Sequence, residues 1–157
     1  MDTAGISEIR QEILSLPPKK VVELCMQLAR YKKENKELLS FLLFEAHDLQ
    51  AFVEKVKRET EDQFRELPKA NAYLTRKSLR KILRMLGKYA RQTASREAAI
   101  EMLLHFCTTL KSSGLLATPG KAFTALFEQQ LKKIRQLTLQ VAEDLRTDYL
   151  KQLTFLA

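Results

Sequence analysis

The sequence has few of the residues that interrupt helices and few of the residues that bind metals. It contains four glycines, four prolines and no tryptophan. Few turns can therefore break the chain, and its abundant Ala, Leu, Glu, Lys, Arg and Gln favour helix. With two histidines and two cysteines, a four-ligand nitrogen and sulfur site would need all of them to converge. We expect no metal and no cofactor.

Long apolar runs are also missing. The longest nearly apolar window, residues 38–46, is far shorter than the ~20 residues that a membrane-spanning helix needs. The first residues carry acids where a signal peptide would carry cations, and they include no long apolar core. We therefore expect no membrane span and a cytoplasmic location. Cys25 and Cys107 fall in apolar helical runs, which is typical of buried, reduced thiols.

No segment shows sustained strand alternation, and no Asn-Gly or Asp-Gly hairpin signal occurs. A chain of 157 residues is long enough to bury a core. The sequence therefore predicts an all-α single domain over residues 1–157, with residues 1–5 flexible. We expect five to six helices, arranged as a helical bundle or a short α–α superhelix with a long C-terminal helix.

Apolar periodicity and turn residues set the expected helices. They are 5–15, 17–31, 38–66, 70–92, 96–112 and 119–153. Ser95 is expected to cap the helix over 96–112, Gly114 to follow it in a left-handed conformation, and Thr118 and Pro119 to begin the last helix. The apolar pattern of 96–112 predicts burial of Ile100, Leu103, Leu104, Cys107 and Leu110.

The polar run 31–37 is interpreted as a turn with Asn35 as N-cap, in preference to a joint within a longer helix. Residues 38–44 are apolar on nearly all sides, which predicts the centre of the core. The last helix carries a single apolar stripe and would span roughly 50 Å.

Three prolines are evenly spaced. Pro17, Pro68 and Pro119 lie 51 residues apart, and each is expected to open a helix. This spacing suggests three stacked helix-hairpin units. However, residues 17–34 and 68–85 share little beyond the proline and one leucine. The spacing also exceeds the roughly 40–47 residues of such helical repeats. We favour the absence of a true repeat.

Candidate catalytic groups are sparse. His47, beside Glu45 and Asp48, has no second His or Cys at i+3 or i+4, and adjacent helical residues do not face one another. His105 and Cys107 lie two apart, so a helix places them on different faces. No Gly-rich phosphate loop is present. An enzyme would require a histidine to meet acids or a cysteine across helices in a cleft, so we favour a non-enzymatic role.

Residues 69–92 concentrate the charge of the chain. The whole sequence has 27 Lys+Arg and 19 Asp+Glu, and this segment holds eight of the cations and no carboxylate. It therefore accounts for the entire formal excess of +8. On a helical wheel, seven of the cations fall within an arc of roughly 140°, opposite an apolar face. These seven candidate partner-binding residues are Arg76, Lys77, Arg80, Lys81, Arg84, Lys88 and Arg91.

Four explanations of this cationic face stay open. The cations can pair with acids of residues 54–66, dock an acidic protein partner, bind a nucleic-acid backbone, or lie on a membrane surface. The last is the least favoured, because the opposite face is needed for the core. Apolar residues beside the cations would indicate a protein partner, whereas a log-linear loss of affinity with salt would indicate nucleic acid. Only Tyr73 is an aromatic on this face, so base stacking is weakly supported. We expect an adaptor for an acidic protein, with nucleic-acid backbone binding as the alternative.

Two stretches resemble known sequences. Residues 16–48 (LPPKKVVELCMQLARYKKENKELLSFLLFEAHD) and 78–116 (SLRKILRMLGKY…HFCTTLKSSGLL) resemble an uncharacterised family of small all-helical bacterial proteins. The resemblance covers most of the chain and implies a compact helical cytoplasmic protein. It includes no catalytic or ligand motif, so it implies no functional residues.

Overall fold

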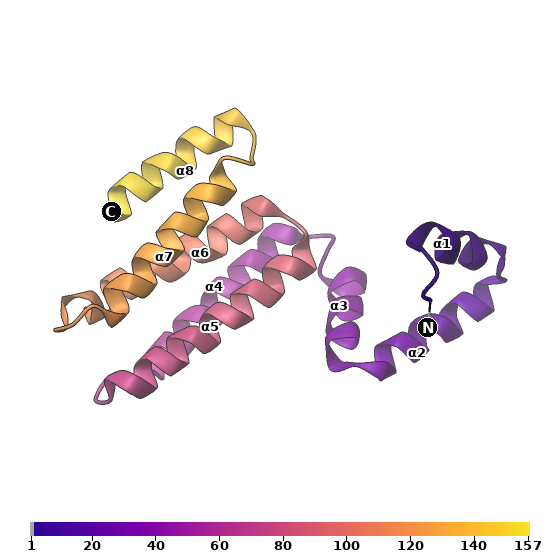
Figure 1. Cartoon of the computed structure of the whole chain (residues 1–157), viewed down its shortest axis with the longest axis horizontal. Coiled ribbons are helices and arrows are strands. Elements are labelled where there is room, and N and C mark those ends of the chain that lie inside the picture. Colours follow the sequence, from indigo (N-terminus) through magenta and orange to yellow (C-terminus); the bar gives the residue numbers. More distant parts are fainter. Residues whose placement is uncertain (1) are drawn as a thin grey trace. The chain divides into compact units, whose positions relative to one another are not determined.

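The computed structural model describes residues 2–157, which form helices and no strand (Figure 1). The elements in this range are α1 (Ile6–Ser15), α2 (Pro18–Tyr31), α3 (Lys33–Phe44), α4 (Leu49–Arg65), α5 (Ala72–Thr93), α6 (Arg96–Ser112), the 3-10 turn η1 (Leu115–Ala117), α7 (Ala122–Thr138) and α8 (Glu143–Leu156). The all-α class is confirmed. The expected number of helices was too low, since eight α-helices lie in the described range. Of residues 1–5, expected to be flexible, Met1 lies outside that range.

Contacts group the chain into two compact units. The N-terminal unit ends at Glu45 and holds α1, α2 and α3, and the C-terminal unit runs from Ala46 to Ala157 and holds the remaining helices. The expectation of a single domain stays a prediction.

Prolines and one polar turn define the N-terminal unit. Leu16 ends α1 in an extended conformation, because a residue before proline avoids the α region. Pro17 then caps α2. Lys32 is also extended and separates α2 from α3, so the turn expected within 31–37 is confirmed. Asn35 is not its N-cap. It lies inside α3, and its side-chain nitrogen donates to the carbonyl of Leu28 at 2.8 Å.

The prediction that residues 38–44 form the centre of the core was wrong. Phe41 is the only residue of α3 that is buried. The other large apolar side chains of this segment, Leu38, Leu42, Leu43 and Phe44, are exposed. A helix that is apolar on most sides is buried only if neighbours cover those sides. Within the N-terminal unit α3 packs on one helix, α2, and one neighbour covers one face.

The long helix expected over residues 38–66 was also wrong, because the chain turns at residues 45–48. Asp48 is the N-cap of α4, and its Oδ1 accepts a hydrogen bond from the backbone N–H of Ala51 at 3.0 Å. Aspartate is among the strongest N-capping residues, so the side chain stabilises a new helix start. His47 lies in this turn and is exposed.

The core of the C-terminal unit is built around α6. This helix contacts α4, α5, α7 and α8, as Figure 1 shows. Its buried residues are Ala98, Ile100, Met102, Leu103, Leu104, Phe106, Cys107 and Leu110, and they include all five that the apolar pattern predicts (Ile100, Leu103, Leu104, Cys107 and Leu110). Ser95 caps α6 as expected, because its Oγ accepts from the N–H of Ala98 at 3.1 Å. Gly114 takes the expected left-handed conformation after the helix.

The long C-terminal helix expected over 119–153 was wrong as well. It is two helices, α7 and α8, separated by residues 139–142. The Nη2 atom of Arg146 donates to the carbonyls of Leu139 and Val141 at 3.2 Å each. These bonds satisfy carbonyl groups that have no partner within the helix where α7 ends. Beyond the turn, α8 packs on α6 and α7.

The evenly spaced prolines do not open equivalent helices. Pro17 is itself a helix cap. Asn71, rather than Pro68, caps α5, and Lys121 occupies the cap position of α7 beyond Pro119. The expectation that Thr118 and Pro119 begin the last helix was therefore wrong. The common spacing does not correspond to a common structural unit.

Candidate partner-binding surface

The cationic face is held outward by the burial of the opposite side of α5. The side-chain oxygen of Asn71 accepts the N–H of Leu74 at 3.0 Å and starts this 22-residue helix. Its buried residues are Thr75, Leu79, Ile82 and Leu86, which recur at three and four and so share one face. Five of the seven candidate cations are exposed, while Arg76 and Lys88 are half-buried.

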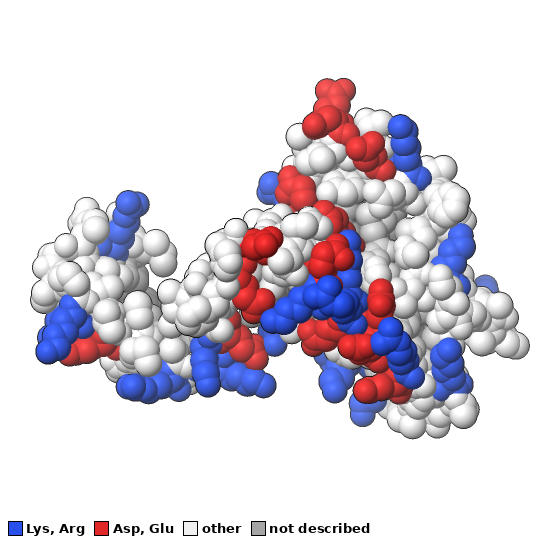
Figure 2. All heavy atoms as spheres, turned by 180° about the vertical axis from the view of Figure 1, so that it is seen from behind, with Lys and Arg blue, Asp and Glu red and all other residues white. Residues whose placement is uncertain are grey.

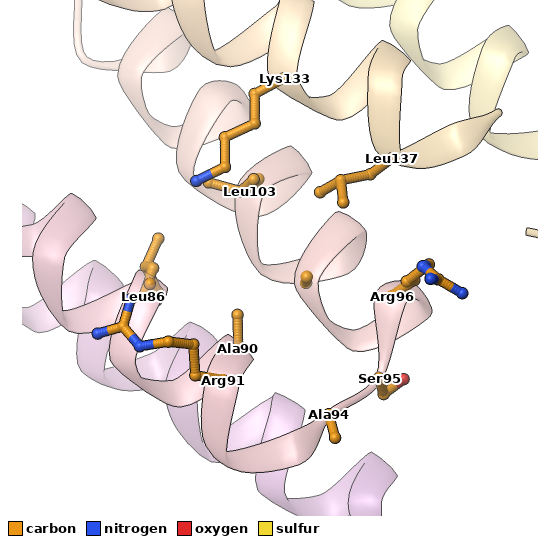
Figure 3. A pocket seen from close by; sticks show the side chains of 11 residues that line it. Leu86, Ala90, Arg91, Ala94, Ser95, Arg96, Leu103, Lys133 and Leu137 are labelled. Carbon is orange, nitrogen blue, oxygen red and sulfur yellow. The ribbon is translucent and has the colours of Figure 1, made fainter. Parts of the chain in front are cut away.

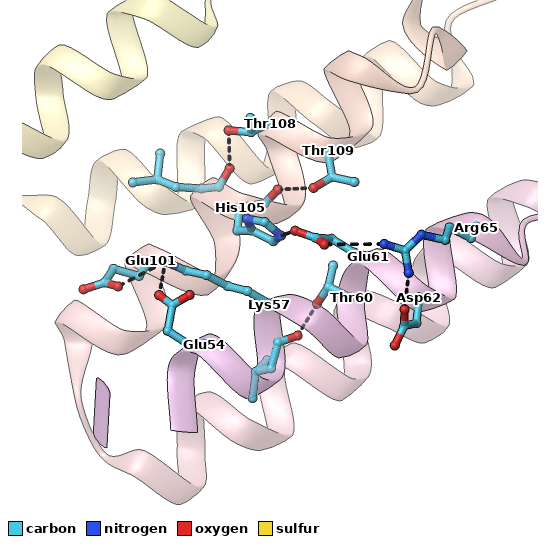
Figure 4. Close-up of polar contacts among 12 residues, drawn as sticks. Glu54, Lys57, Thr60, Glu61, Asp62, Arg65, Glu101, His105, Thr108 and Thr109 are labelled. Atoms are coloured by element: carbon cyan, nitrogen blue, oxygen red, sulfur yellow. Dashed lines mark hydrogen bonds and ion pairs between the residues drawn. The ribbon is translucent and has the colours of Figure 1, made fainter. Parts of the chain in front are cut away.

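Acids of α4 pair with cations that do not belong to α5 (Figure 4). Lys57 Nζ lies 3.1 Å from Glu54 Oε1 and 3.4 Å from Glu101 Oε2 on α6. The hydrogen bond from Lys57, together with its positive charge, lowers the pKa of the Glu54 carboxyl. Arg65 pairs with Asp62 one turn earlier on the same helix. These contacts are local to α4 or cross to α6.

Six of the seven candidate cations form no ion pair within the part of the chain that the structure describes. They are Arg76, Lys77, Arg80, Lys81, Arg84 and Arg91. The seventh, Lys88, lies with its Nζ 5.5 Å from the ring centroid of Tyr89, whose hydroxyl bonds to Glu59 at 3.1 Å. The acids of residues 54–66 therefore do not pair with these six cations.

Two adjoining clefts lie between α5 and α7, over α6. One has a volume of about 410 Å³ and the other of about 800 Å³. They share Gly87, Arg91, Leu103 and Lys133, so they form a single groove. We call it the basic groove, because its charged lining residues are Arg84, Arg91, Arg96, Lys132 and Lys133, and neither cleft is lined by an Asp or a Glu.

The basic groove combines charged walls with an apolar floor. Figure 3 shows Lys133 reaching from α7 into the space between α5 and α7, with Leu103 and Leu137 beside it. Leu86 and Ala90 of α5 and Ala99 of α6 complete the apolar lining. All five cations of the groove are exposed, and none forms an ion pair with a described residue.

This lining differs from the charge pattern elsewhere. On the side of the molecule shown in Figure 2, acidic and basic side chains are intermixed over much of the C-terminal unit. Intermixed charges of this kind neutralise one another locally, as Lys57 and Glu54 do. The basic groove lacks such partners in its lining, so its positive potential is not cancelled from within.

The sequence indicated only part of this surface. Arg84 and Arg91 belong to the predicted cationic face, and the structure brings them to the groove, but Arg96, Lys132 and Lys133 were missed. A signal was present. No acid occurs between Glu128 and Glu143, and Gln129, Lys132, Lys133 and Gln136 follow the i, i+3, i+4, i+7 spacing of one helix face. Nothing in the sequence, however, places that face opposite α5.

His105 does meet a carboxylate across helices. Its Nε2 lies 3.1 Å from Glu61 Oε1 on α4, an ion-pair distance without hydrogen-bond geometry. Cys107 is buried on another side of α6, and burial raises the pKa of its thiol to about 12. The expectation that both cysteines are buried was wrong for Cys25, which is exposed on α2. Neither His105 nor His47 lines the basic groove. General acid–base catalysis needs the group within reach of a bound substrate, so we interpret the contact as structural.

The described residues include neither a metal-binding cluster nor a membrane-spanning helix. Among residues 2–157, no group of three or more His, Cys, Asp or Glu side chains is arranged to hold a metal ion. None of the helices in that range is both long enough and apolar enough to cross a membrane.

Comparisons with known proteins return no relative. No protein family, no curated protein and no solved structure matches the chain. The resemblance of residues 16–48 and 78–116 to small helical bacterial proteins gains no support from them. A functional assignment must therefore rest on the groove and the cationic face.

Proposed function

We propose that the chain is a cytoplasmic, non-enzymatic interaction module that docks an acidic protein partner on the cationic face of α5. One observation carries the proposal: six of the seven candidate cations have no ion-pair partner among the described residues, and apolar side chains line the clefts beside two of them, Arg84 and Arg91. A surface with both properties offers a partner charge pairing and apolar burial together.

The energetic case depends on adding small contributions. Like charges at i, i+4, such as Arg76 with Arg80 and Arg80 with Arg84, cost an isolated helix about 0.2–0.5 kcal/mol each. An acidic partner removes that repulsion and adds exposed ion pairs worth about 0.2–1 kcal/mol each. Apolar burial contributes about 25 cal/mol for each Å² removed from water. Docking requires that several such pairs and the buried apolar patch together outweigh the cost of association.

The apolar residues favour a protein over a nucleic acid. Phosphate backbones contact cations and polar groups, whereas the half-buried Ala90, Ala99 and Leu137 offer them nothing. The alternative, nucleic-acid backbone binding through the same seven cations, is supported by their alignment along residues 76–91 of α5, or roughly 23 Å. Of the aromatic residues of α5, only Tyr73 is largely exposed, which gives little platform for base stacking.

A salt series distinguishes the two. Binding of a labelled polyglutamate peptide and of a labelled DNA duplex and single strand is measured by fluorescence anisotropy from about 0.02 to 0.3 M NaCl. We expect polyglutamate to bind at low salt and the Arg76/Arg80/Arg84→Gln variant to bind it at least about fivefold more weakly, roughly 1 kcal/mol. A matched control, Arg10/Lys19/Lys36→Gln, removes the same charge from exposed positions of the N-terminal unit.

Both variants lower the formal net charge from +8 to +5, so a nonspecific charge effect would weaken binding equally. Circular dichroism confirms that each variant is folded. Duplex or single-strand binding that is tighter than polyglutamate binding, with a log-linear salt dependence, would support the alternative and contradict the proposal. The absence of polyglutamate binding even at the lowest salt would also contradict it.

A further inference from the structure

We infer that the basic groove between α5 and α7 binds an acidic amphipathic helix of the partner, an inference that rests on the proposed function. The apolar residues of that helix would cover the floor, and its flanking carboxylates would face Arg84 and Arg91 on one side and Lys132 and Lys133 on the other. The groove thereby adds α6 and α7 to a surface that the sequence confines to α5.

The charge of the lining selects an acidic occupant. Five cations from three helices line the groove, and no Asp or Glu lines it. Each of the five is exposed and lacks an ion-pair partner among the described residues. An occupant without negative charge would leave these cations unpaired and partly desolvated, which is unfavourable.

The floor selects an occupant with apolar side chains. Ala90 of α5, Ala99 of α6 and Leu137 of α7 line the floor and are half-buried, so a partner can contact them, whereas Leu86 and Leu103 are already buried within the fold. The two clefts, of about 410 and 800 Å³, have the volumes typical of sites that enclose a drug-sized group. Such a space admits a few side chains of a partner and excludes a whole domain, which fits a single helix laid along the groove.

A helix suits the groove better than an extended strand. Both walls are helices whose backbone groups are already bonded within the helix, so no strand edge is available for pairing. An extended chain would press unbonded N–H and C=O groups against the apolar floor, whereas a helix satisfies its own. Arg84 and Arg91 are seven residues apart, or two turns, so carboxylates at i and i+7 of the occupant can match them.

Gly87 keeps the centre of the groove open. It lines both clefts, and a Cβ built there meets only the far end of Arg91, at an ordinary 3.7 Å. A larger side chain at this position would therefore enter the groove without a backbone clash. Replacement of a glycine inside a helix by leucine also favours the helical state. Gly87→Leu is thus a variant that fills the groove, keeps every charge and protects the fold.

The test uses the full chain and three labelled probes. The first is an acidic amphipathic helical peptide of about 14 residues, four turns, with Leu at i, i+3 and i+7 and Glu on both flanks. The second is a peptide of the same composition whose leucines are scattered around the helix, and the third is polyglutamate. We expect Gly87→Leu to weaken binding of the first probe by about tenfold or more, because the leucines of the probe lose their burial site. Polyglutamate binding should change less than about twofold.

A matched pair on α7 tests the second wall. Lys133→Gln and Arg135→Gln each remove one exposed cation from the same helix, but only Lys133 lines the groove. We expect Lys133→Gln to weaken the amphipathic probe about threefold or more and Arg135→Gln to change it less, as a direct ion pair differs from a distant charge. Thermal unfolding of each variant confirms the fold.

The possible outcomes separate the two proposals. If polyglutamate binds, but Gly87→Leu and Lys133→Gln leave the affinity for the amphipathic probe unchanged, the groove is not the binding site. Docking on α5 then remains the proposal. Equal affinity for the amphipathic and scattered peptides would also show that the groove is not the binding site. No binding of any acidic probe overturns the proposed function itself. A concentration-dependent dimer of the free chain that Gly87→Leu abolishes would assign the groove to a second copy and overturn the inference.

Discussion

The buried thiol of Cys107 makes the stability of the C-terminal unit depend on pH. Its side chain is fully buried in α6, and burial raises the pKa of the thiol from 9.0 to about 12. The folded state therefore holds a proton that the unfolded state loses between about pH 9 and 12. The stability that the neutral thiol contributes is complete below pH 9 and is lost as the pH rises through that window. We expect the free energy of unfolding by urea to fall between pH 8 and pH 10.5.

The control for this expectation is Cys107→Ala. It costs stability at pH 8 through the cavity it leaves, but it removes the titrating thiol, so its decline with pH should be shallower. Burial, followed by the charges of Glu101, Glu97 and Asp148, raises the pKa of Tyr149 as well, and that shift acts in the same direction. Some decline therefore persists in the variant. Equal slopes for the two proteins would show that Cys107 does not contribute.

Within the single helix α5, residues that the helical wheel places on the same side differ in burial. Leu74 and Leu79 both fall on its apolar side, yet Leu79 is fully buried and Leu74 is 43% exposed. We expect Leu79→Ala to lower the free energy of unfolding by about 2–5 kcal/mol and Leu74→Ala by less than about 1 kcal/mol. Urea unfolding followed by circular dichroism measures both. Similar losses for the two substitutions would contradict the placement of α5 on α6.

The helices that could be predicted are those whose ends carry a local signal. Ser95 at the start of α6, Gly114 after it and the prolines at 17–18 gave boundaries that the structure confirms. Asp48 is a signal of the same kind, an N-cap inside an apolar run, and it was overlooked because the run looked continuous.

The break between α7 and α8 has no such signal. Residues 139–142 contain no glycine or proline, and the apolar stripe continues across them. The reason for the break lies in packing. The 17 residues of α6 span roughly 25 Å, so a straight helix of about 50 Å would leave its far half without a neighbour. Folding back buries Tyr149, Leu153 and Leu156, and no local pattern records that gain.

The basic groove shows the same limit at a functional site. The cationic face of α5 follows from spacing alone, since its periodicity fixes which residues share a side. That Lys132 and Lys133 lie across from Arg84 depends on how α5 and α7 each pack on α6, a relation between residues almost 50 positions apart in the sequence. Sequence periodicity describes faces within a helix and gives no information on which faces meet.

Over the whole molecule, charge is divided between the two units. Residues 1–45 contain seven Lys+Arg and seven Asp+Glu, so the entire formal excess of +8 belongs to residues 46–157. Cations without partners repel one another, and salt screens that repulsion over a Debye length that falls from about 30 Å at 0.01 M to about 8 Å at 0.15 M. The electrostatic cost of folding is thus concentrated in the unit that carries the proposed function.

This distribution predicts an inverse relation between binding and stability. At about 0.01 M salt, we expect Arg76/Arg80/Arg84→Gln to be more stable than the unmodified protein by about 0.6–1.5 kcal/mol, because it removes three i, i+4 repulsions, the last of them between Arg84 and Lys88. Added salt to about 0.15 M should stabilise the unmodified protein more than the variant. Thermal unfolding at the two salt concentrations measures both effects. A variant that is less stable than the unmodified protein would mean that these arginines hold the fold together.

The two walls of the basic groove differ in chemistry as well as in position. The wall from α5 presents arginines, Arg84 and Arg91, and the wall from α7 presents lysines, Lys132 and Lys133. A guanidinium binds a carboxylate through two parallel hydrogen bonds and fixes its orientation, whereas an ammonium acts as a mobile point charge. Lysine can also be acetylated, which removes its charge, while arginine keeps its charge even when methylated. Covalent modification can therefore remove the positive charge of the α7 wall, whereas the α5 wall keeps its charge.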